Sequence, residues 1–169
     1  MRPIATLLAT LALTTGTASA QPPDRPPQEA AAPIGVVATA DVGGGGLLGG
    51  GTQYTSTCLF EGEVALGYEL PLGLRPELAF AVGVAPTGHV ALRPGIHYAI
   101  PEMPFYLRAA LDWSTVRGAL AWRWLLAGAG VELRVTDVLG GFAEADLGLP
   151  FERNVGVGAL VRAGVSFRY

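Results

Sequence analysis

Apolar and polar residues alternate over the last part of the chain. From Val155 to Tyr169 every second residue is apolar or aromatic, and the residues between them are mostly small or charged, such as Arg162 and Arg168. Successive side chains of a strand point to opposite faces, so this pattern predicts a strand with one apolar face. The segment is longer than a typical globular strand and long enough to cross a bilayer at a tilt.

Seven further segments with the same alternation precede it, which predicts eight strands in all. They cover residues 34–44, 58–70, 74–85, about 89–98, about 105–113, about 124–134, about 142–149 and 155–169. The glycine-rich first connection and the fifth connection, Ser114–Arg123, are predicted to be long loops, whereas the second, fourth and sixth are compact turns. Long loops at one end and short turns at the other are typical of membrane barrels.

Almost every charged residue inside a segment falls on the parity opposite to the apolar one. The predicted inward charges are Asp41, Glu61, Glu63, Glu69, Glu77, Asp112, Glu132, Glu144, Asp146, Arg75, Arg93, Arg108, Arg134, Arg162 and Arg168. Mixed charges at this density indicate a salt-bridge network filling a narrow lumen, in which the arginine fork satisfies two carboxylates. The inward glycines and alanines leave a narrow polar pore as the alternative. Parity alone also fits a soluble barrel with the opposite face inside.

The first residues predict export. An apolar stretch from Ile4 to Leu13, too short to span a membrane as a helix, precedes the A-x-A pattern of Ala18 and Ala20. Residues 1–20 are therefore predicted to be a signal peptide cleaved near Ala20, residues 21–33 a proline-rich periplasmic leader, and residues 34–169 the barrel. The net charge of −3 gives no basic footprint for nucleic acid.

Aromatic residues gather near the predicted strand ends, as in an interfacial girdle. They are Tyr68, Tyr98, Phe105, Trp113, Phe167 and Tyr169. With the signal peptide and the terminal V-S-F-R-Y, the chain resembles the small eight-stranded outer-membrane barrels of the OmpA/OmpX-like superfamily. The resemblance covers residues 34–169, although Tyr169 stands where a terminal Phe is commoner.

The resemblance implies an all-β fold, an eight-stranded antiparallel up-and-down transmembrane β-barrel, in the outer membrane of a Gram-negative cell envelope. It also implies that Phe167 and Tyr169 belong to an insertion signal read by the barrel-assembly machinery. The expected partners are outer-membrane lipid and that machinery, and the expected state is a monomer.

No motif for catalysis, a cofactor or a metal is present in the sequence. His89 and His97 lie on one strand about 26 Å apart, too far for one site. A Ser114–His89–Asp112 cluster is geometrically conceivable, and Ser56 is a further nucleophile candidate, but a histidine in the wall network is the better interpretation. The single cysteine, Cys58, is interpreted as a small residue at the start of a strand or an exposed thiol.

Trp122 and Trp124 share the inward parity at the start of the sixth strand. Either both side chains cap the lumen or the register shifts near the loop; an interfacial anchor is the simplest role for the cluster. The sequence thus predicts a structural or surface-interaction barrel without catalysis. The alternative is a narrow pore or a small-ligand transport or binding barrel, including a soluble lipocalin-like carrier.

Overall fold

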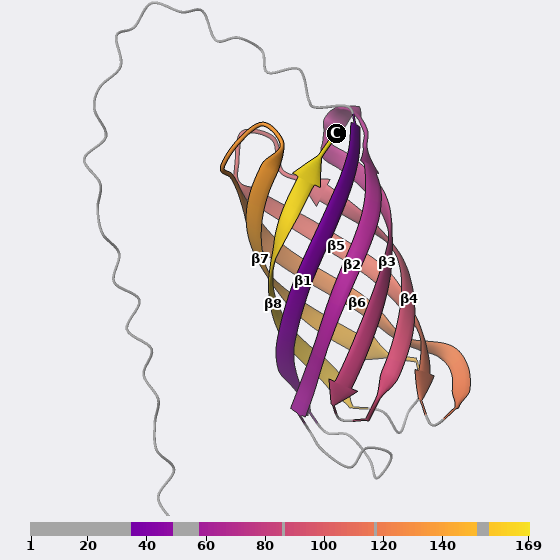
Figure 1. The fold of residues 1–169 in the computed structure, drawn as a ribbon. Helices are drawn as coiled ribbons and strands as arrows, with labels where there is room; N and C mark the ends of the chain where they lie inside the picture. The colour runs from indigo at the N-terminus through magenta and orange to yellow at the C-terminus, as the bar shows by residue number, and fades with distance from the viewer. Residues whose placement is uncertain (1–34, 49–57, 86, 117, 152–155) are drawn as a thin grey trace, which may run out of the picture. The chain divides into compact units, whose positions relative to one another are not determined.

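Eight antiparallel strands form one closed barrel in the computed structural model of the chain (Figure 1). They are β1 (Gly35–Leu48), β2 (Cys58–Glu69), β3 (Leu74–Ala85), β4 (His89–Ala99), β5 (Phe105–Val116), β6 (Ala119–Arg134), β7 (Leu139–Pro150) and β8 (Val157–Arg168). Each strand pairs with its sequence neighbours, and β8 closes the barrel against β1. The structure describes residues 35–48, 58–85, 87–116, 118–151 and 156–169. The predicted topology is confirmed.

The barrel has two unlike ends. At the terminal end β1 begins and β8 finishes, joined by backbone hydrogen bonds between Val36 and Tyr169 of 2.9 and 3.2 Å. This end also carries three compact connections, residues 70–73 with the short helix η1 (Pro71–Gly73), 100–104 and 135–138. Residues 49–57, 86–88, 117–118 and 151–156 connect the strands at the other end, called here the distal end.

Side chains sort between the two faces as the alternation predicts. On β2, Leu66 is 63% exposed and Glu63 is 3% exposed, and the same contrast runs round the barrel. A water-soluble barrel needs the opposite arrangement, because large apolar side chains on its outside would face water. The orientation is therefore that of a transmembrane barrel, with apolar residues outward and charges inward. No helix within the described residues is long and apolar enough to cross a membrane.

Exposed aromatic residues mark both borders of the apolar outer surface. The distal border carries Phe60, Trp113, Trp122 and Phe151, and the terminal border carries Tyr68, Tyr98, Phe105, Phe167 and Tyr169. Phe105 and Trp113 lie on one strand at a separation of about 26 Å. A tilt of about 40° reduces that distance to roughly 20 Å along the membrane normal, close to the height of the apolar band in such barrels.

Two connections predicted as long loops are partly strand. β1 continues through Gly45–Leu48, because these residues pair with β8 and Gly45 and Gly46 pair with β2 as well. The predicted loop Ser114–Arg123 is mostly the end of the β5–β6 hairpin, with Ser114 opposite Ala121. The first of these two loop predictions was wrong because backbone pairing on both sides outweighs the low strand propensity of glycine. Ile34, Ser56, the signal peptide and the leader lie outside the described residues.

A β-bulge separates the two tryptophans that share a parity in the sequence. Asp112 pairs with Trp124, but the next residue, Trp113, pairs with Trp122, so Arg123 is the extra residue of the bulge. Trp124 is 9% exposed and faces the lumen, whereas Trp122 is 47% exposed and stacks on Trp113 at 5.9 Å. Trp124 thus caps the lumen, as the first predicted alternative has it, and the register shift of the second alternative places Trp122 on the outer face.

Candidate functional site

The centre of the lumen is organised around one carboxylate, Glu63 of β2. Three arginines reach it: Arg93 Nη1 at 2.7 Å, Arg108 Nη2 at 2.5 Å and Arg162 Nη1 at 2.7 Å. These arginines come from β4, β5 and β8, so the contacts cross the barrel rather than follow one hairpin. Glu63 therefore ties several sides of the wall together.

Arg93 makes the most regular contacts of the network. Its Nη1 and Nη2 donate to the two oxygens of Glu61 at 2.5 and 2.8 Å, and its Nε donates to Asp112 Oδ2 at 2.7 Å. This is the bidentate geometry that a planar guanidinium favours with a carboxylate. Burial of the charge requires such pairing, because an unpaired ion inside the wall would lose its hydration without compensation.

Arg162 is the most deeply buried arginine among the residues that the structure describes, at 1% exposure. Its nitrogens lie 2.7 Å from Asp146 Oδ2 and 3.0 Å from Glu61 Oε1, yet none of them meets an oxygen at a hydrogen-bond angle. Because the guanidinium nitrogens lie close to these carboxylate oxygens without hydrogen-bond geometry, Arg162 is held by charge attraction rather than by aligned hydrogen bonds. Space for it comes from Gly43, where a Cβ atom would lie only 2.8 Å from Arg162 Cγ.

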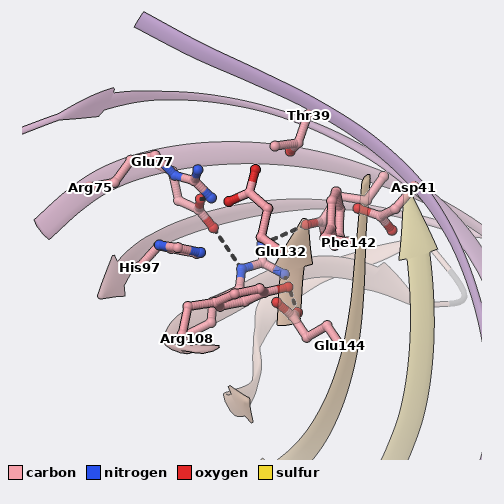
Figure 2. Close-up of a pocket in the computed structure, with 11 residues that line it drawn as sticks. Thr39, Asp41, Arg75, Glu77, His97, Arg108, Glu132, Phe142 and Glu144 are labelled. Atoms are coloured by element: carbon pink, nitrogen blue, oxygen red, sulfur yellow. Dashed lines mark hydrogen bonds and ion pairs between the residues drawn. The ribbon is translucent and has the colours of Figure 1, made fainter. Parts of the chain in front are cut away.

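Arg108 occupies the lumen toward the terminal end of the network. Figure 2 shows its guanidinium between Glu77 and Glu144, to which Nε and Nη1 donate at 2.6 and 3.2 Å. Arg75 lies 3.3 Å from the same Glu77. A small cavity of about 20 Å³ beside these groups is lined by Asp41, Phe142 and their neighbours, which is room for about one water molecule.

A second charge cluster fills the terminal end. Arg168 donates to Glu132 at 2.7 Å and to Glu69 at 3.4 Å, and Ser166 donates to the same Glu132. Arg134 has the predicted inward parity, but its side chain is 51% exposed at the rim and 3.7 Å from Glu69. The structure thus places all fifteen charged residues predicted to face inward in or at the lumen, in two clusters.

The histidines take separate wall positions. His97 stacks on Tyr106 with ring centroids 4.2 Å apart, in the terminal half of the lumen. His89 Nε2 lies 3.5 Å from Glu61, and its Nδ1 lies 2.9 Å from the Thr87 carbonyl oxygen.

The conceivable serine–histidine–aspartate cluster does not have catalytic geometry. Asp112 pairs with Arg93, and Ser114 is fully buried with no hydrogen-bond partner for its Oγ. Its members therefore lack the chain of hydrogen bonds that activates a serine nucleophile. Within the described residues no group of three or more His, Cys, Asp or Glu side chains is arranged to hold a metal ion.

The distal part of the lumen is apolar instead of charged. Inward residues here are Leu47, Leu59, Trp124, Leu126 and Leu160. The polar residues that line the same volume are Glu61, His89, Arg93, Asp146 and Arg162. The indole nitrogen of Trp124 donates to the Gly156 carbonyl oxygen at 3.4 Å. We call this volume the distal recess. It was not predicted, although Leu47, Leu59 and Leu160 stand on the inward parity and could have indicated it.

Known proteins share the fold but not the sequence. No protein-family model and no curated protein sequence matches the chain. Neisserial surface protein A superposes with a TM-score of 0.58 at 17% identity, over 79% of this chain and 97% of that one. The N-terminal barrel domain of OprF from Pseudomonas aeruginosa gives 0.53 at 14% identity, over 80% and 98%.

A third similar structure is Ail, the attachment invasion locus protein of Yersinia pestis, solved with the heparin analogue sucrose octasulfate. Its TM-score is 0.51 at 13% identity, over 80% of this chain and 99% of Ail. At these identities the three similarities show the fold alone, which is that of eight-stranded transmembrane barrels.

Proposed function

We propose that this chain is a small integral barrel of a bacterial outer membrane with a structural or surface-interaction role. The observation that carries the proposal is the combination of an apolar outer band between two aromatic borders with a lumen closed by ion pairs. Such a barrel presents its connections to the outside and leaves no room for substrate passage. The insertion signal at Phe167 and Tyr169 and the monomeric state belong to this proposal.

Two similar structures support a surface role by their names, a surface protein of Neisseria and an attachment protein of Yersinia. The connections at the distal end are then the contact region, as the short turns of the terminal end face the periplasm. Catalysis is not part of the proposal, since the conceivable serine cluster lacks the required contacts. A narrow pore is the second candidate, favoured only by the separate small cavities in the lumen.

Site-specific quenching tests which face meets lipid. In a background with Cys58→Ser, an environment-sensitive dye is attached to a cysteine introduced at Val161 or at Leu160, which are 64% and 7% exposed. In reconstituted vesicles, quenchers in the lipid phase should reach the dye at position 161 and not at position 160. Native envelope fractionation and a gel-mobility shift on boiling should report a folded outer-membrane barrel. Shielding of position 161 from lipid would refute the membrane assignment.

A further inference from the structure

The central part of the lumen holds more acids than cations. Within the described residues its network has seven carboxyl groups and four guanidinium groups, a difference of three. The carboxyl groups are Asp41, Glu61, Glu63, Glu77, Asp112, Glu144 and Asp146, and the guanidinium groups are Arg75, Arg93, Arg108 and Arg162. With His89 and His97 both counted as cations, one carboxyl group is still in excess. A buried ion without a counter-charge loses its hydration without compensation, so this excess has to be neutralised.

Asp41 of β1 stands directly opposite Glu63 of β2. The two residues are partners in the register of these strands, and both side chains face the lumen. The Cβ atoms of such a pair are about 4.5–5.5 Å apart, and like charges there are destabilising. Glu63 is held as an anion by three arginine contacts of 2.5–2.7 Å. The repulsion therefore disfavours a charge on Asp41.

Asp41 has the weakest compensation of all the carboxyl groups in the network. Its side chain is 4% exposed, and Arg162 Nη1 lies 3.8 Å from its Oδ1, too far to donate a hydrogen bond. Among the described residues no hydrogen bond reaches its carboxyl group. Asp146 also lacks an aligned hydrogen bond, but its Oδ2 lies only 2.7 Å from Arg162 Nε.

An apolar ring occupies the space beside Asp41 on the β8 side. A Cβ atom at Gly164, the β8 partner of Asp41, would lie 2.6 Å from Asp41 Cβ and 2.7 Å from Phe142 Cζ. Phe142 therefore packs close to Asp41, as Figure 2 shows, and it offers neither a donor nor a charge. The other titratable or charged residues round the adjoining cavity are Glu63, Arg75, Glu77, His97, Tyr106, Arg108, Glu132 and Glu144. Carboxyl groups outnumber guanidinium groups there too, which favours a neutral acid.

We propose that Asp41 is a proton-binding site, whose carboxyl group stays neutral beside the ionised Glu63 while the barrel is folded, and that loss of this proton at alkaline pH weakens the barrel. A neutral acid needs no counter-charge and removes the repulsion between β1 and β2. A metal ion is the poorer counter-charge, because no three acids among the described residues are arranged to hold one.

The sign of the pH dependence follows from where the proton is bound. An aspartate of the unfolded chain is ionised above about pH 4. Since folded Asp41 keeps the proton, the unfolding equilibrium constant rises with pH, by up to roughly tenfold for each pH unit. The rise ends once the folded barrel has also lost the proton. The chain contains no lysine, so few other groups titrate between about pH 5 and pH 9.

The test compares Cys58→Ser protein with the same protein carrying Asp41→Asn, by urea titration of barrels folded in zwitterionic vesicles between about pH 5 and pH 9. Asn imitates the neutral acid. The parent should therefore lose stability as pH rises, by up to roughly tenfold more per pH unit than the variant, and the variant should be the more stable at pH about 9. The matched control is Asp112→Asn. Because Asp112 accepts from Arg93 Nε at 2.7 Å, its loss should weaken the barrel at every pH and keep the parent's pH dependence.

Infrared spectra of the folded proteins at neutral pH detect the proton directly. The parent should show the carbonyl band of a protonated carboxyl group that Asp41→Asn lacks. Asp41→Ser is a second neutral replacement, so the comparison does not depend on the folding of one variant. The same pH dependence in the parent and in the folded neutral variants would overturn the proposal, and so would the same carboxyl band. Stability that depends on sodium rather than on pH, when choline replaces sodium at constant ionic strength, would also overturn it.

Discussion

Arg162 illustrates how a charged side chain is accommodated on the inward face of a strand. Its guanidinium is removed from water almost completely and lies near four carboxyl groups, Asp41, Glu61, Glu63 and Asp146. A buried ion loses a large hydration free energy. The ion pairs of Arg162 therefore mainly offset this desolvation penalty and add little to the net stability of the fold. The severe effect comes when Arg162 is removed, because Asp146 is then buried without the arginine that lies 2.7 Å from it, whereas Glu61 and Glu63 keep Arg93.

Arg162→Leu should therefore lower the free energy of unfolding by about 3–5 kcal/mol, the usual result of breaking a buried pair. Arg134→Leu is the matched control. Its side chain is 51% exposed and 3.7 Å from Glu69, so its loss should lower the free energy of unfolding by about 1 kcal/mol or less. Denaturant titration of the folded barrels in lipid vesicles measures both. A similar small effect for the two variants would mean that the lumen is wet and that the network is weak.

At the scale of the strand, most of what the sequence predicts comes from the alternation of apolar and polar residues at every second position. Strand number, the division of each strand into an apolar and a charged face, and the membership of the charged face follow from alternation alone. Which face lies outside does not, because the same alternation also fits a soluble barrel. The partners within the network do not, because Arg93, Arg108 and Arg162 meet Glu63 only after the barrel closes with its own stagger between strands. The bulge at Arg123 turns the Trp122 side chain to the outer face, and no turn residue in the sequence indicates this bulge.

Glycine was the least reliable guide to where strands end and loops begin. The run from Gly43 to Gly46 suggested a flexible loop, yet it is strand, paired on one side with β2 and on the other with β8. Small residues are needed there because side chains from the neighbouring strand occupy the space, as Arg162 does beside Gly43. The inward glycines therefore accommodate large partners, which is a different role from holding open a water channel.

The seam between β1 and β8 gives a matched pair of substitutions. A Cβ atom at Gly45 would collide with the Ala159 carbonyl oxygen, which is backbone and cannot move aside, whereas one at Gly44 would lie 3.8 Å from its nearest neighbour. Gly45→Ala should lower the free energy of unfolding by about 1–3 kcal/mol, as overpacking does. Gly44→Ala should change it by about 0.5 kcal/mol or less. Equal effects in denaturant titrations would show that the seam relaxes freely.

For the whole molecule, the lumen consists of three successive parts. The terminal cluster around Glu132 and Arg168, the central network around Glu63, and the distal recess each leave only a small cavity, of about 70, 20 and 40 Å³. A water molecule needs about 10–15 Å³ on this measure, so each cavity holds one or a few waters. Ion pairs at 2.5–2.7 Å separate the recess from the parts below it.

The folded protein should therefore show no sustained stepwise conductance in planar lipid bilayers. Removing two of the crossing arginines, in Arg93→Ala with Arg108→Ala, leaves the carboxyl groups in larger excess, so any current that appears should be carried by cations, as a reversal potential under a salt gradient would show. Gel mobility before and after boiling confirms that each preparation is folded. A stable conductance in the unmodified barrel would contradict the closed lumen and favour the pore, because a continuous water path would then run through the ion pairs around Glu63.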